Sequence, residues 1–158
     1  MEIQKTALYN YHKNLGAKFV AGRISHSAYL KLSIPNLVEE KKVLYVDGDT
    51  IFKDCPSKAF GIDLEDNVLG GVCDYSHFPQ HRKKWESKII PFENANELYI
   101  NSGLLLWNLK APENIKLIEK CKELEESYPD KVRFNDQDLL NKVFEGKKKI
   151  INYQFNHQ

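Results

Sequence analysis

The chain has 158 residues, of which 42% are hydrophobic and 28% are charged. This length and composition are typical of one soluble globular domain with a buried core, so we expect a single domain over residues 1–158. The formal net charge of +1 gives no electrostatic reason to expect nucleic acid or an anionic membrane as the main partner.

The first third of the chain predicts helical segments followed by a strand. Residues 1–25 have a partly apolar face, which indicates a helix. The segment SAYLKLSIPNLV (27–38) is also rich in apolar residues, and its Pro35 would interrupt or bend a helix. The run from Val43 to Val46 is too short for a helix core and predicts a buried strand that ends at Asp47.

Two further apolar stretches predict strands in the middle of the chain. VLGGVCDY (68–75) ends at the carboxylate of Asp74, and LYINSGLLLWNL (98–109) predicts two strand pieces on either side of a bend. The polar residues 101–103 would either satisfy the backbone of a β-bulge or offer hydrogen bonds to sugar hydroxyls at a cavity wall. The residues leave both interpretations open.

The last third predicts two helices and a closing strand. Residues 113–128 carry an apolar stripe between Pro112 and Pro129, which predicts an amphipathic helix. A second helix is expected to begin at Asn135, and IINYQF (150–155) predicts a strand. Strands that alternate with helices indicate an α/β fold with a mainly parallel sheet, in which ligands bind beyond the carboxyl ends of the strands.

The pair Asp47 and Asp49 could serve several purposes. Asp-Gly is a favoured turn, and a second D-x-D occurs at 136–138, so the spacing alone means little. Two carboxylates at the end of a strand could hold Mg²⁺ or Mn²⁺, with Gly48 allowing close approach of a ligand. A phosphatase of the haloacid-dehalogenase type uses the same position, although Thr50 stands one place earlier than that pattern requires.

The expected start of the second helix also admits two interpretations. Asn135 would be the N-cap and Asp138 would complement the helix dipole, so capping alone explains both residues. Capping does not require Gln137, whose amide would lie at the mouth of the helix beside any bound ligand.

The cysteine content indicates a reducing compartment. The three cysteines have no C-x-x-C spacing, which argues against both a disulfide framework and a zinc site. No run approaches the ~18 apolar residues that span a bilayer, and the N-terminus lacks a signal-peptide pattern. We therefore expect a cytoplasmic protein, for which peripheral membrane association stays open, and we expect a homodimer.

Five blocks in order resemble glycosyltransferase family 8, which includes bacterial lipopolysaccharide galactosyl- and glucosyltransferases, general-stress-protein-A-like enzymes and glycogenin. The blocks are SAYLKLSIPNLV, KKVLYVDGDTIFKD, VLGGVCDY, YINSGLLLWNL and NDQDLLNKVF. The resemblance spans about residues 20–155 and implies a GT-A-type nucleotide-sugar-binding fold, with a mainly parallel mixed sheet flanked by helices. It also implies retaining transfer of a hexose from UDP-glucose or UDP-galactose to a saccharide acceptor, with Mn²⁺ or Mg²⁺ as the cofactor.

The resemblance implies roles for residues in the first three blocks. Asp47 and Asp49 would hold the metal against the diphosphate, with Gly48 at the donor, and Asp74 would lie at the donor sugar. The family usually has arginine where this chain has Lys31. Lysine keeps the charge but loses the bidentate geometry of arginine, so we expect altered donor binding.

The last two blocks would supply the reacting face. By motif match, Asn101 and Ser102 would contact the sugar, and the catalytic pair Asp136 and Gln137 would lie under the transferred hexose. These acceptors would stabilise the positive oxocarbenium-like centre that forms when the glycosidic bond breaks. Front-face attack and a transient enzyme adduct would both retain configuration, and the sequence does not choose between them.

The resemblance covers the central part of the family domain. The strand–helix unit that forms the nucleotide pocket has no counterpart in the sequence, and His157 lacks the surrounding pattern of the family's metal-binding histidine block. We therefore expect either a fragment or a truncated protein. The alternatives are the phosphatase and a non-catalytic domain that binds a saccharide or a partner.

Overall fold

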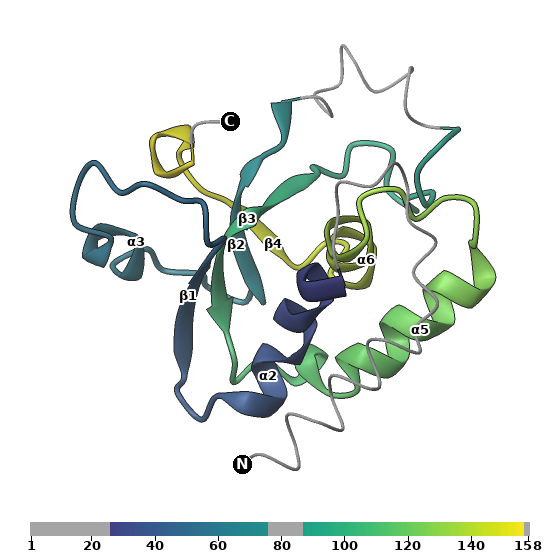
Figure 1. Ribbon diagram of the computed structural model, residues 1–158, viewed down its shortest axis with the longest axis horizontal. Coiled ribbons are helices and arrows are strands. Elements are labelled where there is room, and N and C mark those ends of the chain that lie inside the picture. The colour runs from purple at the N-terminus through teal and green to yellow at the C-terminus, as the bar shows by residue number, and fades with distance from the viewer. Residues whose placement is uncertain (1–25, 76–86, 157–158) are drawn as a thin grey trace.

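The computed structural model describes residues 26–75 and 87–156 (Figure 1). The helix expected in residues 1–25 lies outside the described residues. The described part contains a four-stranded sheet in the order β1-β3-β2-β4. Its strands are β1 (Lys42–Val46), β2 (Leu69–Cys73), β3 (Ile100–Asn108) and β4 (Lys148–Ile150).

The sheet is mixed, as the resemblance implied. β3 pairs antiparallel with both β1 and β2, whereas β2 and β4 pair in parallel. β1, β2 and β4 therefore run in one direction and β3 runs in the other. The sheet is mainly parallel in strand direction, but its pairings are mostly antiparallel because β3 lies between β1 and β2.

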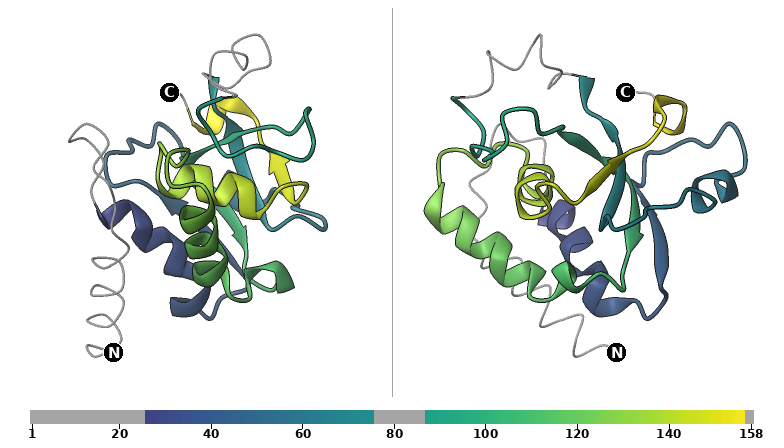
Figure 2. Two further views of the ribbon diagram at one scale, coloured as in Figure 1. Left: turned by 90° about the vertical axis from the view of Figure 1, so that its right-hand side faces the viewer. Right: turned by 180° about the vertical axis from the view of Figure 1, so that it is seen from behind.

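The helical elements lie on both sides of this sheet (Figure 2). The 3₁₀ helix η1 (His26–Ser33) packs with α5 (Leu117–Ser127) and α6 (Asp136–Val143) on one side, and α3 (Ser57–Phe60) lies beside β1 on the other (Figure 1). No helix within the two described ranges is long and apolar enough to cross a membrane. The helical elements are η1 (His26–Ser33), α2 (Ile34–Leu37), α3 (Ser57–Phe60), η3 (Pro112–Asn114), α5 (Leu117–Ser127), α6 (Asp136–Val143) and η4 (Tyr153–Phe155).

Alternating side chains of the strands divide the apolar residues between two clusters. In β1, Val43 and Tyr45 pack against the larger core under α5 and α6, whereas Leu44 and Val46 pack against the smaller cluster. This division follows from the two-residue period of a strand. Trp107 of β3 is fully buried in the larger core.

Two strand predictions need correction. The strand at 43–46 exists, but it is only half-buried, because β1 lies at the edge of the described sheet and pairs only with β3. The stretch 98–109 does not form two strand pieces, since β3 continues from Ile100 to Asn108. Its polar residues produce an irregular pairing instead of a break in the strand.

The prediction of a closing strand over 150–155 is wrong in its position. The strand is β4, which ends at Ile150, and the following residues turn into η4. Asn152 accepts a hydrogen bond from the backbone N–H of Gln154, which favours this turn over further strand pairing.

The two predicted helices are confirmed, with differences at their starts. The first begins at Leu117 rather than 113, because Lys116 has a left-handed backbone, with φ 56°, after the turn η3. It ends before Pro129, as expected. The second begins directly after Asn135, but the Asn135 side chain makes no capping bond.

Asp138 binds the backbone before α6 in the way expected of a capping residue. Its Oδ2 accepts hydrogen bonds from the N–H groups of Arg133, at 2.6 Å, and Phe134, at 2.7 Å. Its Oδ1 accepts the hydroxyl of the buried Tyr99 at 2.6 Å. The carboxylate therefore ties the start of α6 to the segment before β3.

We expect Gly71→Ala to lower the free energy of unfolding by about 1–3 kcal/mol, the usual effect of overpacking a core. A Cβ at Gly71 would lie 2.9 Å from Ile100 Cδ1 and 3.1 Å from Ile100 Cβ. Urea unfolding followed by circular dichroism measures the change. Gly48→Ala is the matched control, since a Cβ there meets nothing within 4 Å. Equal losses of stability in the two variants would contradict this account.

Candidate active site at the end of β1

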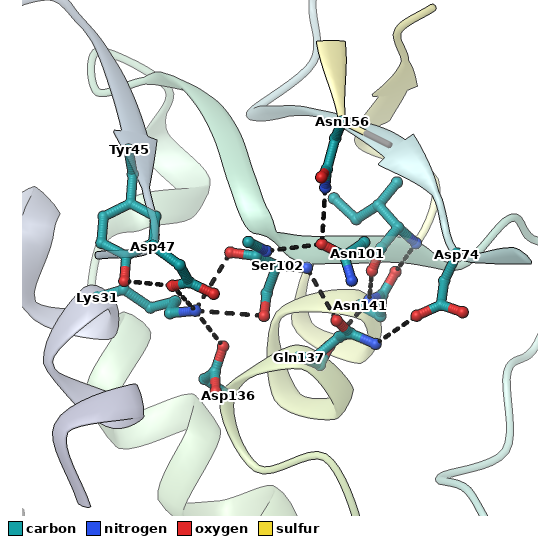
Figure 3. Close-up of polar contacts among 12 residues, drawn as sticks. Lys31, Tyr45, Asp47, Asp74, Asn101, Ser102, Asp136, Gln137, Asn141 and Asn156 are labelled. Carbon is teal, nitrogen blue, oxygen red and sulfur yellow. Dashed lines mark hydrogen bonds and ion pairs between the residues drawn. The ribbon is translucent and has the colours of Figure 1, made fainter. Parts of the chain in front are cut away.

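The sheet topology brings three of the predicted segments to one edge. Asp47 follows the last residue of β1, and Asp74 follows the last residue of β2. Because β3 runs antiparallel between them, its first residues, including Asn101 and Ser102, lie at the same edge. Figure 3 shows these side chains together with those of α6. The expectation of a site beyond the strand ends thus agrees with the fold.

The pairing of β3 becomes irregular where the polar residues 101–103 occur. Gly71 pairs with Leu105 but Cys73 pairs with Ile100, so β3 carries extra residues at this point. The ladder with β1 also ends at Leu104. This register shift agrees with the bulge interpretation, and it leaves backbone groups of β3 to be bound by side chains.

Lys31 of η1 provides the central charge of the site. Its Nζ lies 2.9 Å from Asp136 Oδ2 and 3.2 Å from Asp47 Oδ1. The same group donates to the carbonyl oxygen of Ser102 at 3.2 Å and to its Oγ at 3.3 Å. Lys31 is only 4% exposed, and a buried ammonium group needs such partners to offset its loss of hydration.

The carboxylate of Asp136 is buried behind the site. Burial raises the pKa of Asp136, and the neighbouring Lys31 opposes this increase. Asp136 Oδ2 forms an ion pair with Lys31 but accepts no hydrogen bond within the described residues. Asp136 is only 3% exposed, so little of its carboxylate is accessible to a ligand. Its predicted contact with a sugar stays a prediction.

Gln137 joins β3 to the end of β2. Its Oε1 accepts the backbone N–H of Ser102 at 2.9 Å, and its Nε2 donates to Asp74 Oδ2 at 3.0 Å. These two bonds fix which end of the amide faces each neighbour. One turn further along α6, Asn141 binds both the N–H and the carbonyl oxygen of Ile100 at 2.8 Å.

Asp47 and Asp49 face a cleft of about 750 Å³. Asp49 is exposed, and within the described residues it makes no hydrogen bond or ion pair. Gly48 between them leaves the backbone open to a ligand. Of the other predicted site residues, only Asn101 lines this cleft; the remaining lining includes Gly103, Asn156, Gln154, Ile51, Phe52 and Phe155.

The cleft residues fit a hard divalent cation. Carboxylate oxygens are the ligands that Mn²⁺ and Mg²⁺ prefer, and Oδ2 of Asp47 accepts no hydrogen bond in the described part of the chain. No group of three His, Cys, Asp or Glu side chains within 26–75 and 87–156 is placed to hold a metal ion. Asp47 and Asp49 would therefore need further ligands, such as diphosphate oxygens and water.

Three contributors to the site were not predicted from the sequence. Tyr45 donates its hydroxyl to Asp47 Oδ1 at 2.7 Å, and Asn156 donates to Asn101 Oδ1 at 2.8 Å. Tyr45 precedes Asp47 by two residues and Asn141 follows Gln137 by four, so strand and helix periods could have indicated both. No sequence signal connects Asn156 with Asn101, which lies 55 residues earlier.

We expect Lys31→Met to lower the free energy of unfolding by about 3–5 kcal/mol, since it leaves the buried carboxylate of Asp136 unpaired. Urea unfolding at neutral pH measures the loss. Lys58→Met is the control, because its ion pair with Asp54 is exposed and we expect little change there. A stable Lys31→Met protein would show that the carboxylates do not depend on this charge.

The sequence and the fold match known glycosyltransferases. A putative glycosyltransferase of Haemophilus influenzae is 28% identical over 134 residues, covering 84% of this chain and 39% of that protein. A lipopolysaccharide 1,2-glucosyltransferase of Escherichia coli is 28% identical over 116 residues, covering 72% of this chain and 33% of that protein.

A solved structure of the galactosyltransferase LgtC with donor and acceptor sugar analogs superposes with a TM-score of 0.75 and 31% identity, over 89% of this chain and 50% of that one. The GT-A-type fold implied by the sequence is thereby confirmed. This chain spans half the length of LgtC and less than half of the two curated relatives. The profile described as glycosyl transferase family 8 matches residues 2–158. The chain therefore belongs to glycosyltransferase family 8.

Proposed function

We propose that this chain forms part of a retaining transferase that moves a hexose from UDP-glucose or UDP-galactose to a saccharide acceptor, with Mn²⁺ or Mg²⁺. The observation that carries the proposal is the position of Asp47 and Asp49, which follow β1 and line one cleft. The partly buried network of Gln137, Asp74 and Ser102 lies at the same edge of the sheet. The donor and acceptor sugar analogs named for the LgtC structure support the two substrate classes.

Asp47 and Asp49 would hold the cation at the mouth of the cleft. When bound, a divalent cation supplies a Lewis acid that neutralises the charge developing on the leaving diphosphate. Lys31 pairs with both Asp136 and Asp47, and the exposed carboxylate of Asp49 adds a negative charge at the cleft. Gly48 has no side chain that could keep a diphosphate away from this backbone.

Gln137 and Asp74 would act on the sugar. The N–H of Ser102 holds Oε1 of Gln137 and Asp74 holds its Nε2, so the amide is oriented before a substrate binds. A carbonyl oxygen has two lone pairs, and the second one remains for a positive centre on the sugar. Together with the carboxylate of Asp74, this oxygen would stabilise the oxocarbenium-like transition state. Front-face attack and a transient adduct use the same arrangement.

We expect UDP with Mn²⁺ to stabilise the protein against unfolding by about 2.7 kcal/mol when the free ligand is present at a hundred times its dissociation constant from the protein. Asp49→Asn should abolish most of this stabilisation, since it removes one carboxylate from the cleft. Thermal and urea unfolding with and without UDP, Mn²⁺ and both measure the effect. Asp66→Asn is the matched control, because Asp66 is exposed and does not line the cleft.

Absence of stabilisation by UDP and Mn²⁺ in a folded wild-type chain would contradict the proposal and would favour the non-catalytic domain. The phosphatase alternative has no support from the family to which the chain belongs. Hydrolysis of a phosphomonoester that depends on Asp47 would reverse that conclusion. The cytoplasmic location and the homodimer stay predictions.

A further inference from the structure

The two oxygens of Asp47 have different surroundings. Oδ1 accepts the hydroxyl of Tyr45 at 2.7 Å and lies 3.2 Å from Lys31 Nζ. Oδ2 accepts no hydrogen bond in the described structure and lies 3.2 Å from the position that a Cβ on Gly103 would occupy. The carboxylate is therefore held through one oxygen, while the absence of a side chain at Gly103 leaves room around the other.

Tyr45 is itself held in place by its surroundings. Its ring packs against the larger core, and the ammonium group of Lys31 lies 4.9 Å from the ring centroid. Tyr45 and Asp47 are two residues apart at the end of an extended segment, so their side chains leave the backbone on the same face. Figure 3 shows the hydroxyl of Tyr45 directed at Asp47. Asp47 thus accepts its hydrogen bond from a side chain that packs against the core.

Asp49 lacks such support. It is exposed and has no hydrogen bond or ion pair among the described residues. A cation that binds both carboxylates must order Asp49, whereas Asp47 is already oriented. Preorganisation of one ligand reduces the entropy lost on binding, and partners of metal-ligating groups commonly change affinity by 10–100-fold.

We propose that Tyr45 is a positioning residue of the cation site, which fixes Asp47 through Oδ1 so that Oδ2 faces the ligand. This inference rests on the proposed function, because it requires that Asp47 binds a divalent cation. Tyr45 lies outside the D-x-D motif. The proposal is that its hydroxyl, rather than its aromatic ring, orients the carboxylate of Asp47.

Tyr45→Phe removes only this hydroxyl and tests the proposal. Titration of the full chain with Mn²⁺, alone and with UDP, gives the dissociation constant from the electron paramagnetic resonance signal of free Mn²⁺. We expect Tyr45→Phe to weaken Mn²⁺ binding by about tenfold, the lower end for loss of a partner of a metal ligand. Urea unfolding of the same variant gives its stability.

Tyr29→Phe is a matched control in the same chain. Tyr29 donates its hydroxyl to Glu125 Oε1 at 2.7 Å, the same distance as between Tyr45 and Asp47, but this pair lies away from the cleft. We expect Tyr29→Phe to lose a similar amount of stability and to bind Mn²⁺ like the wild type. The control therefore separates positioning of Asp47 from general destabilisation.

Each outcome of the titration decides the inference. Weaker Mn²⁺ binding by Tyr45→Phe alone supports it. Unchanged binding by Tyr45→Phe, or an equal loss in Tyr29→Phe, overturns the role of Tyr45 and leaves the proposed function in place. No binding of Mn²⁺ by the wild type, with or without UDP, overturns both.

Discussion

The site depends on one buried ammonium group. Lys31 lies among acceptors from three other parts of the fold, namely the end of β1, the bulge of β3 and the start of α6. Dehydration of a charged amine is unfavourable unless such acceptors replace water, so the contacts of Lys31 favour one relative placement of these elements. Lysine suits this position, because its three donors can point to separate acceptors, whereas the planar fork of arginine matches a single carboxylate or phosphate. The structure thus gives Lys31 partners within the protein.

The bulge of β3 creates a second requirement that α6 fulfils. Past the end of the ladder with β1, the backbone of Ile100 and Ser102 is bound by two amide side chains instead of a strand. Asn141 and Gln137 can do this because they are four residues apart on a helix and their targets are two residues apart on a strand. The interaction that satisfies the backbone also orients Gln137 towards Asp74. Folding and the orientation of a candidate catalytic group therefore share the same hydrogen bonds.

The features that could be predicted from the sequence are the local ones. The apolar run before Asp47 predicted β1, and the stripe of 113–128 predicted α5, since periodicity depends only on neighbours along the chain. The half-burial of β1 was missed, because exposure depends on which strands lie beside it. The contacts of Lys31 with Asp136 and of Asn156 with Asn101 were missed for the same reason. Each contact joins segments that are far apart in the sequence, and no pattern within either segment predicts that the two segments meet in the fold.

The different freedom of Asp47 and Asp49 gives physical meaning to the spacing between them. The first carboxylate directly follows the last paired residue of β1, where Asp47 N–H still donates to the carbonyl oxygen of Gly103 at 2.9 Å. The second lies beyond Gly48, after the chain has left the sheet, and its side chain is exposed. One carboxylate is therefore placed by the sheet and by Tyr45, whereas no described residue holds the other. In the proposed cation site, one ligand is therefore oriented in advance and only the other must be ordered on binding, which reduces the entropy lost.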